Sequence, residues 1–247
     1  MFNVEGKWAL VTGASRGIGY LAALYLADKG CNIIAHARKK ENCEKVIEEI
    51  KKHGVKVYAV EAELSDVDEV NKMCKEIDNY GTKVDIILNN AGYQIAYHRD
   101  YLGTPAYDFD VSFRVNTTAP MMIAYHFLPG MKERGYGRIV NTTSGIDLEP
   151  EQAAYSASKA ALSKITRDLG RDFEGTDVMI SLTDPGWCRT DLGGKNAPNE
   201  PESAIPGVVV GVFIDDKKSG RLFAAQDYTG LSLEEAVKKA QKVKGVY

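Results

Sequence analysis

Short apolar runs rich in β-branched residues alternate with segments of helical periodicity along most of this chain. The first run, residues 8–12, has the short continuous apolar pattern of a buried strand, and a helical segment follows it closely. Strands and helices in strict alternation are joined by right-handed crossovers, which place helices on both faces of a parallel sheet. The pattern therefore predicts an α/β fold with a doubly wound parallel sheet.

The same periodicity sets the expected elements. It predicts strands at residues 8–12, 32–36, 55–60, 84–88, 138–143 and 178–183, and helices at 17–29, 40–53, 65–80, 108–134 and 151–173. Ser65, with Asp68 three positions later, approximates a capping box for the helix at 65–80. No linker, repeat or low-complexity segment interrupts the pattern, so we expect one domain over residues 1–247. The segment at about 186–206 is rich in Gly, Pro and Asn and is expected to form a mobile substrate flap.

Charge and composition limit the classes of function. A net charge of −3 gives no reason to expect nucleic acid or a membrane surface as a partner. The N-terminus lacks the features of a signal peptide, and the most apolar stretch, residues 205–214, is too short to span a bilayer. We therefore expect a cytoplasmic protein. Four scattered cysteines predict neither a disulfide framework nor a metal site: Cys31, Cys43, Cys74 and Cys188.

Tyr155 and Lys159 have the spacing that puts two side chains on one face of a helix. A nearby positive charge favours an ionised phenol, whose ordinary pKa is about 10. A shift of about three units needs about 4 kcal/mol, which one lysine and a cationic cofactor can supply. Tyr155 is thus a candidate general acid or base. The spacing alone is common, and it fits an ordinary surface pair equally well.

A glycine-rich loop stands between the first expected strand and the first expected helix. Its sequence, Thr-Gly-Ala-Ser-Arg-Gly-Ile-Gly at residues 12–19, allows a tight turn and a close approach of the backbone to a pyrophosphate at a helix N-terminus. The position of the loop in a strand–loop–helix unit predicts a Rossmann-type dinucleotide site. Its expected cofactor contacts are Gly13, Ser15, Arg16, Gly17, Ile18 and Gly19.

The end of the second expected strand indicates which nucleotide binds. A carboxylate there would accept from the ribose 2′-hydroxyl of NAD, but the chain has no acid between His36 and Glu41. Arg38, with Arg16 in the loop, can instead clamp a 2′-phosphate by charge-assisted hydrogen bonds. Residues 38–40 could also be the basic start of an exposed helix, although cations are disfavoured at helix N-termini. The predicted cofactor is NADP(H).

Taken in order, these motifs resemble the short-chain dehydrogenase/reductases over nearly the whole chain. The motifs are residues 12–19, Asn89-Asn90-Ala91-Gly92, Asn116, Ser144, Tyr155 with Lys159, and Pro185 to Thr190. The C-terminal part and the segment around Trp187 resemble the carbonyl-reductase branch more than the acyl-carrier-protein reductases. By family habit the resemblance also implies a homo-oligomer, a dimer or a tetramer.

The resemblance implies a role for each catalytic candidate. Ser144 would hydrogen-bond the substrate oxygen, and Tyr155 would exchange a proton with it. Lys159 would lower the pKa of Tyr155 and bind the nicotinamide ribose. Asn116 would hold a water that links Lys159 to solvent. The nicotinamide itself would supply or accept the hydride.

Further cofactor contacts follow from the same resemblance. Thr190 and the backbone near Pro185 and Gly186 would contact the carboxamide. Asn89, Ala91 and Gly92 would line the adenosine side, and Glu63 stands where the family usually has an aspartate near the adenine. The remaining implied contacts are Leu64 and Asn90.

The expected substrate pocket is mainly apolar or aromatic. Its candidate wall residues are Tyr93, Gln94, Ile146, Leu148, Trp187, Cys188 and Leu192. Such a wall suits a hydrophobic ketone, quinone or steroid-like compound. Arg189 is the nearby cation, and it could equally form a salt bridge elsewhere. We expect an NADP(H)-dependent carbonyl/alcohol oxidoreductase. The alternatives are a reductase of carrier-bound acyl chains and a catalytically silent nucleotide-binding protein.

Overall fold

The computed structural model describes residues 1–245 and contains one seven-stranded sheet of order β3-β2-β1-β4-β5-β6-β7. Every neighbouring pair is parallel, which confirms the doubly wound sheet expected from the sequence. The strands are β1 (Trp8–Val11), β2 (Asn32–Ala37), β3 (Val57–Glu61), β4 (Ile86–Asn89), β5 (Gly137–Thr142), β6 (Val178–Asp184) and β7 (Leu222–Ala224).

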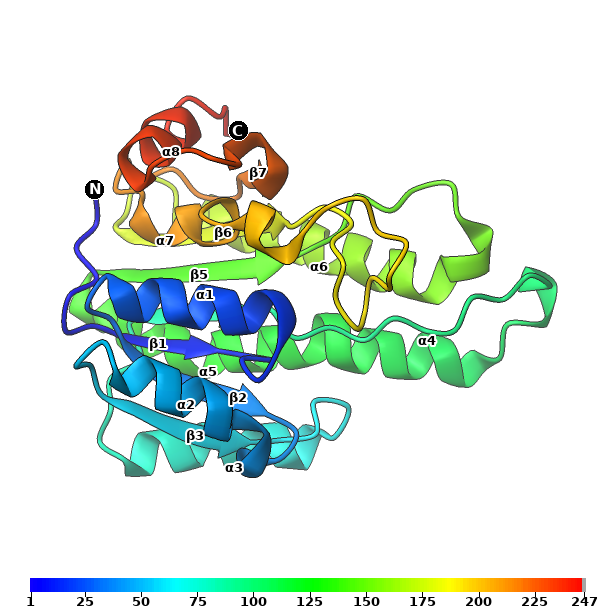
Figure 1. Ribbon diagram of the computed structural model, residues 1–247, viewed down its shortest axis with the longest axis horizontal. Coiled ribbons are helices and arrows are strands. Elements are labelled where there is room, and N and C mark those ends of the chain that lie inside the picture. Colours follow the sequence, from blue (N-terminus) through cyan, green and yellow to red (C-terminus); the bar gives the residue numbers. More distant parts are fainter. Residues whose placement is uncertain (246–247) are drawn as a thin grey trace.

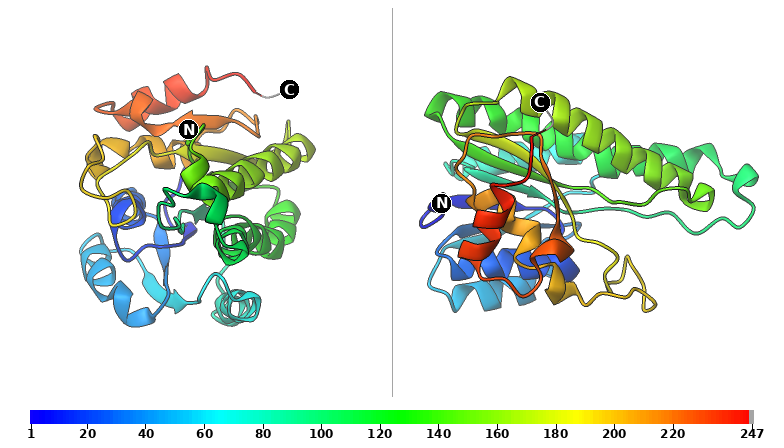
Figure 2. Two further views of the ribbon diagram at one scale, coloured as in Figure 1. Left: turned by 90° about the vertical axis from the view of Figure 1, so that its right-hand side faces the viewer. Right: turned by 90° about the horizontal axis from the view of Figure 1, so that it is seen from above.

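Helices cover both faces of this sheet (Figures 1 and 2). They are α1 (Gly17–Asp28), α2 (Glu44–Lys51), α3 (Val67–Asn79), α4 (Ala106–Phe113), α5 (Ala119–Arg134), α6 (Ala153–Asp172), α7 (Val210–Phe213) and α8 (Leu233–Ala240). One buried apolar layer joins the sheet to α1, α2, α7 and α8, and a second joins it to α3, α5 and α6. No helix within residues 1–245 is long and apolar enough to cross a membrane.

The strand order reverses between β1 and β4, and this reversal creates a crevice. From β1 the chain builds outward through β2 and β3, then returns to β4 on the other side of β1. The segments that follow β1 and β4 therefore diverge at the carboxyl edge of the sheet, where ligands bind in open α/β folds. The segments after β5 and β6 begin at the same edge (right-hand side of Figure 1).

The single helix expected at 108–134 is interrupted in the structure. A π-helical turn, Arg114–Thr118, separates α4 from α5. Neither Gly nor Pro marks this turn in the sequence. Its polar side chains instead bond to neighbouring segments, as when the Thr117 hydroxyl donates to the Ser158 carbonyl at 2.7 Å. Such turns are often found at functional sites.

The expected N-cap of α3 is also wrong. Asp66, not Ser65, caps this helix, with its carboxylate accepting from the backbone N–H groups of Asp68 and Glu69. The Ser65 hydroxyl donates to Glu63 instead. The Asp66 carboxylate directly precedes the first helical residue and reaches these N–H groups, while the Ser65 hydroxyl is bound to Glu63.

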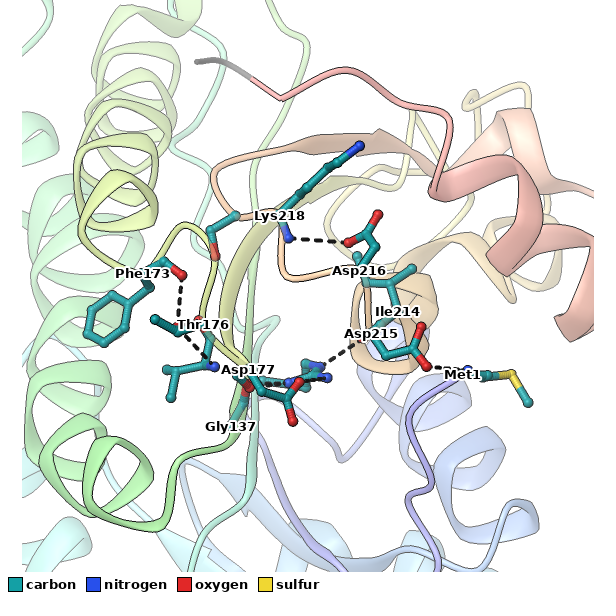
Figure 3. A network of polar contacts seen from close by, with 12 residues as sticks. Met1, Gly137, Phe173, Thr176, Asp177, Ile214, Asp215, Asp216 and Lys218 are labelled. Carbon is teal, nitrogen blue, oxygen red and sulfur yellow. Dashed lines mark hydrogen bonds and ion pairs between the residues drawn. The ribbon is translucent and has the colours of Figure 1, made fainter.

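The C-terminal part adds β7 and α8, which the periodicity did not predict. β7 is only three residues long, too short to show a period, and α8 has a capping box made by Ser232 and Glu235. A buried Arg138 guanidinium holds this part to the sheet, donating to the Asp177 carboxylate at 2.6 Å and the Ile214 carbonyl at 3.0 Å. Figure 3 shows Asp177 and Ile214 on either side of this network.

Candidate active site

A cavity of about 1620 Å³ lies at the carboxyl edge of the sheet and reaches from the loop after β1 to the segments after β5 and β6. Most of the candidate site residues line it, although they come from every part of the first four-fifths of the chain. Asn116 and Gly19 lie outside its wall. The sheet thus gathers the separate sequence motifs into one place.

The glycine-rich loop forms the nucleotide end of this cavity. Gly13 and Gly17 have φ values of +67° and +56°, in the left-handed region that favours glycine. A Cβ at Gly19 would lie 2.3 Å from the Gly13 carbonyl oxygen, so the helix start can pack against the loop only without a side chain. This leaves a backbone cradle at the N-terminus of α1, which fits a pyrophosphate.

Two buried side chains that sequence reasoning missed support the loop. His36 accepts from the Gly13 N–H through Nδ1 at 3.2 Å and donates to the Ala62 carbonyl through Nε2 at 3.1 Å. Burial lowers the pKa of His36 to about 4, which keeps the ring neutral for this arrangement. The Thr12 hydroxyl oxygen accepts from the N–H groups of Asn90 and Ala91, both at 3.0 Å. In the sequence, His36 and Thr12 are marked only as polar residues at the ends of expected apolar strands.

Two cations, Arg16 and Arg38, line the nucleotide end of the cavity, and Lys39 and Lys40 follow Arg38 in the chain. Lys40 pairs with Glu76 at 2.7 Å, and Arg16 pairs with Asp191 across the cavity at 2.8 Å. The Arg16 pair is largely exposed and therefore weak. Lys39 lies 4.0 Å from Glu61. Arg38 lines the cavity and is exposed.

Glu63 and Leu64 line the same end of the cavity. One carboxylate oxygen of Glu63, Oε1, accepts from both the backbone N–H and the hydroxyl of Ser65 at 3.1 Å. Glu63 therefore fixes the turn before α3 as well as facing the cavity.

Asn89 does not line the adenosine side, contrary to expectation. It is buried, and its Nδ2 donates to the Asn141 side-chain oxygen at 2.8 Å and to the Pro120 carbonyl at 3.2 Å. Side chains alternate along a strand, so this last residue of β4 points into the helix layer. Asn90, Ala91 and Gly92 do line the cavity.

Tyr155 and Lys159 lie one turn apart on α6, at the opposite end of the cavity from the adenosine side. Both are buried, with 7% and 4% of their surface exposed. The Lys159 ammonium donates to the Thr142 carbonyl at 2.8 Å and lies 6.0 Å from the centroid of the Tyr155 ring. Ser144 follows β5 and faces the same space. The candidate catalytic groups of two different segments thus converge.

Burial governs the ionisation of this pair. It raises the pKa of Tyr155, against a lowering by the Ser144 hydroxyl, and Asp184 raises this pKa further. It also lowers the pKa of Lys159 to about 8, while Asp184 acts in the opposite direction. Burial thus has the largest effect on the pKa of Tyr155 in this structure. The expected lowering of this pKa by Lys159 together with a cationic cofactor stays a prediction.

Asn116 lies in the π-helical turn and ties three segments together. Its Oδ1 accepts from the Tyr93 N–H at 2.8 Å, while its Nδ2 donates to the Tyr93 carbonyl at 2.7 Å and to the Ser158 hydroxyl at 3.0 Å. Gly92 lies beside it, since a Cβ there would be 3.5 Å from both Asn116 Oδ1 and Lys159 Nζ. The side chain thus fixes the segment after β4 beside Lys159. A water held by Asn116 stays a prediction.

The remaining wall of the cavity is mainly aromatic and apolar. Six of the seven expected wall residues line it, whereas Leu148 is exposed and lies outside this wall. Sequence reasoning missed Tyr97, Tyr107, Val111, Asp147, Glu149, Gln152 and Asp184. Most of these stand in irregular segments or on α4, where no motif marks them. Arg189 points away, because it pairs with Glu200 and donates to the Ala197 carbonyl.

The expected flap has a defined local structure. A bridge pairs Cys188 with Asn199, and the Trp187 indole N–H donates to the Gly193 carbonyl at 2.7 Å. A 3-10 turn, Pro201–Ala204, follows. These contacts join residues within the same segment, which borders the cavity. The mobility of this segment stays a prediction.

The parallel sheet, the glycine-rich loop and the cavity between them define the class of Rossmann-type oxidoreductases. A family model described as short chain dehydrogenase matches residues 7–201. The chain is also 34% identical over 193 residues to a 3-oxoacyl-(acyl-carrier-protein) reductase of Aquifex aeolicus, covering 77% of each protein. It is 33% identical over 195 residues to versicolorin reductase of Emericella nidulans, covering 77% of this chain and 72% of that protein. The chain therefore belongs to the short-chain dehydrogenase family, whose members bind a nicotinamide cofactor.

Solved structures agree with this assignment. A metagenomic short-chain oxidoreductase in complex with NADP has 30% identity and a TM-score of 0.69, covering 78% of this chain and 87% of that one. The promiscuous reductase LugOII has 26% identity and a TM-score of 0.77, covering 93% and 99%. The relatives named acyl-carrier-protein reductases do not confirm the expected placement in the carbonyl-reductase branch.

Proposed function

We propose that this protein is an NADP(H)-dependent oxidoreductase that interconverts a carbonyl and a secondary alcohol on a small hydrophobic molecule. The observation that carries the proposal is the convergence of Ser144, Tyr155 and Lys159 at one end of a cavity whose other end is the glycine-rich loop. The loop fits a pyrophosphate, and the cavity of about 1620 Å³ that joins it to these groups has room for an extended cofactor.

Ser144, Tyr155 and Lys159 each have a separate role in proton transfer. Ser144 donates a hydrogen bond to the substrate oxygen, which favours the negative charge that develops there during reduction. Tyr155 donates its proton to that oxygen, and in oxidation it accepts the proton back. Lys159, held by the Thr142 carbonyl, stabilises the phenolate that forms and binds the nicotinamide ribose. The nicotinamide supplies or accepts the hydride.

NADP(H) is preferred because Arg38 lines the cavity as an exposed cation at the end of β2. A guanidinium suits bidentate contact with a 2′-phosphate. Arg16 can also contact the 2′-phosphate when its exposed ion pair with Asp191 breaks. The NADP bound to the similar metagenomic oxidoreductase supports this choice.

A hydrophobic ring compound suits the aromatic substrate wall best. Tyr93, Tyr97, Tyr107 and Trp187 supply flat apolar surfaces around the catalytic end. LugOII, which is similar over nearly its whole length, is described as catalysing a keto-reduction. By family habit we also propose a cytoplasmic homo-oligomer.

A reductase of carrier-bound acyl chains is the second candidate, favoured by the names of relatives with 34% identity. An acidic carrier protein would need a basic surface at the cavity mouth. Asp147 and Glu149 stand there instead, and both are exposed. Their charge disfavours the docking of such a carrier.

The test follows NADPH absorbance with a panel of aromatic ketones, quinones, steroids and 3-oxoacyl thioesters, the last both free and carrier-bound. The proposal predicts turnover of ring ketones or quinones and slow or absent turnover of carrier-bound thioesters. Preference for the carrier-bound form would establish the second candidate. Tight NADPH binding with no turnover of any compound would favour a silent nucleotide-binding protein.

A further inference from the structure

The glycine-rich loop and the segment after β6 contact each other at the nucleotide end of the cavity. An ion pair joins the Arg16 guanidinium in the loop to the Asp191 carboxylate at 2.8 Å. Beside it, a Cβ added at Gly17 would lie 3.3 Å from the Thr190 side chain, so Thr190 lies against the start of α1. All four of these residues line the cavity. Two pairs of adjacent residues therefore hold one segment against the other.

Asp191 belongs to a tight turn that also forms part of the expected substrate wall. The Thr190 hydroxyl oxygen accepts from the Gly193 N–H at 3.1 Å, and the Trp187 indole N–H donates to the Gly193 carbonyl at 2.7 Å. These bonds join residues 187–194 into one unit. Three members of this unit line the cavity as expected wall residues: Trp187, Cys188 and Leu192. A change of position at Asp191 would therefore also move the substrate wall.

The ion pair is weak enough for a ligand to replace it. The side chains of Arg16 and Asp191 are 66% and 70% exposed, and ion pairs as exposed as this contribute little to stability. A phosphate group carries up to two negative charges and can bind a guanidinium through two hydrogen bonds. The 2′-phosphate of NADP(H) would therefore compete with Asp191 for Arg16. NAD(H) has a neutral hydroxyl at that position and would not.

We propose that the Arg16–Asp191 ion pair is a latch between the glycine-rich loop and residues 187–194, which the 2′-phosphate of NADP(H) opens and the 2′-hydroxyl of NAD(H) leaves closed. Asp191 is thereby a specificity-determining residue, because it makes the release of the substrate wall depend on which cofactor is bound. The inference rests on the proposed function, in which Arg16 contacts the 2′-phosphate. It goes beyond that function by linking the two ends of the cavity.

The first test measures amide hydrogen exchange in residues 187–194 with two probes that lack a nicotinamide. Adenosine 2′,5′-bisphosphate carries the 2′-phosphate, and adenosine 5′-monophosphate does not. We expect the bisphosphate to speed exchange in this segment by about two- to fivefold, the scale of an exposed ion pair, and the monophosphate to leave it unchanged. Asp191→Asn should exchange at the faster rate without any probe. Equal exchange in the free and the bisphosphate-bound wild type would overturn the proposal.

A double-mutant cycle shows whether Asp191 acts through Arg16. Asp191→Asn should bind the bisphosphate about two- to fivefold more tightly than the wild type, because Arg16 is then free to contact it. The same substitution should have no such effect in a protein that also carries Arg16→Gln. Equal tightening in both backgrounds would mean that Asp191 acts only by long-range repulsion, which would contradict the latch.

Glu202→Gln is the matched control for the loss of a charge. Glu202 is an exposed carboxylate of the same flap that does not line the cavity, so its replacement should change neither the exchange of residues 187–194 nor the affinity for the bisphosphate. A Glu202→Gln variant with the behaviour of Asp191→Asn would show that any carboxylate of the flap has this effect, and the latch would be refuted.

Neither measurement needs turnover of a substrate, so the latch and the proposed activity are tested separately. A protein with the expected exchange rates that reduces no carbonyl would sink the proposed oxidoreductase activity and leave the latch established. Failure of the bisphosphate to bind would overturn the latch, even in a protein that reduces ketones.

Discussion

The Lys159 ammonium donates to the Thr142 carbonyl at 2.8 Å, which joins a buried charge on α6 to the last residue of β5. This bond fixes the direction of the lysine side chain beside Tyr155. It compensates only part of the cost of desolvation, because burial still lowers the pKa of Lys159 to about 8. The candidate site thus contains a buried ammonium whose charged form is disfavoured by burial.

That cost should appear in the pH dependence of stability. Between pH 8 and about 10.5 the unfolded chain keeps the Lys159 proton that the folded protein has lost. The unfolded state then binds more protons, so the free energy of unfolding gains a rising contribution with pH in this window. Lys159→Met should remove this contribution and be more stable than the wild type at pH 7 by about 2 kcal/mol. Urea unfolding at several pH values measures the free energy of unfolding and its slope with pH. Lys164→Met, at an exposed lysine, should leave the slope unchanged.

Tyr155→Phe should abolish proton transfer without disturbing the cavity. The ring stays in place and the hydroxyl is lost, so turnover should fall by about 10²-fold or more, the usual contribution of a general acid. NADPH affinity, measured by fluorescence titration, should change little. Tyr125→Phe, at an exposed tyrosine of α5, is the matched control and should keep full turnover. Activity of Tyr155→Phe near the wild-type level would refute the mechanism.

The sequence predicted the sheet and the site motifs because their signals are local. A continuous apolar run, a glycine that must lack a Cβ and a spacing of one helical turn can each be recognised within a few residues. The supports of the site could not be predicted, because each depends on a distant partner. His36 matters through Gly13, and Asp184 through Gly145 and Gly186.

The π-helical turn and the ionisation of Tyr155 show the same limit. The turn at Asn116 depends on hydrogen bonds to Tyr93 and to α6, which no window of sequence contains. The raised pKa of Tyr155 depends on how deeply the ring is buried, whereas the i, i+4 spacing reports only that a lysine is near. Sequence therefore identified side chains that the fold brings together in one cavity but not how burial changes their ionisation.

Arg38→Asp should change cofactor preference. Removing the guanidinium and adding a carboxylate should weaken NADPH binding by about 10- to 100-fold, the scale of one charge-assisted hydrogen bond. NADH has no 2′-phosphate and should bind with nearly unchanged or improved affinity. Dissociation constants for both cofactors measure the effect. Lys39→Asp is the control, because that neighbouring cation faces Glu61 and should affect both cofactors equally. Equal weakening of both cofactors by Arg38→Asp would remove the basis for NADP(H).

Gly19→Ala should disrupt the nucleotide loop, because its Cβ would lie 2.3 Å from the Gly13 carbonyl oxygen and 2.5 Å from Asn90 Nδ2. The loop must then move away from α1, so NADPH affinity should fall by about 10-fold or more and stability by about 1–3 kcal/mol, the range for overpacking. Gly130→Ala is the matched control within another helix, where the added Cβ approaches only the end of the Arg134 side chain. It should keep NADPH affinity and gain about 0.5–1 kcal/mol, since alanine favours a helix interior. Thermal unfolding measures the stability of both variants, and NADPH titration measures their cofactor affinity. Unchanged NADPH affinity in Gly19→Ala would show that the close contact between Gly19 and the Gly13 carbonyl does not shape the cofactor site.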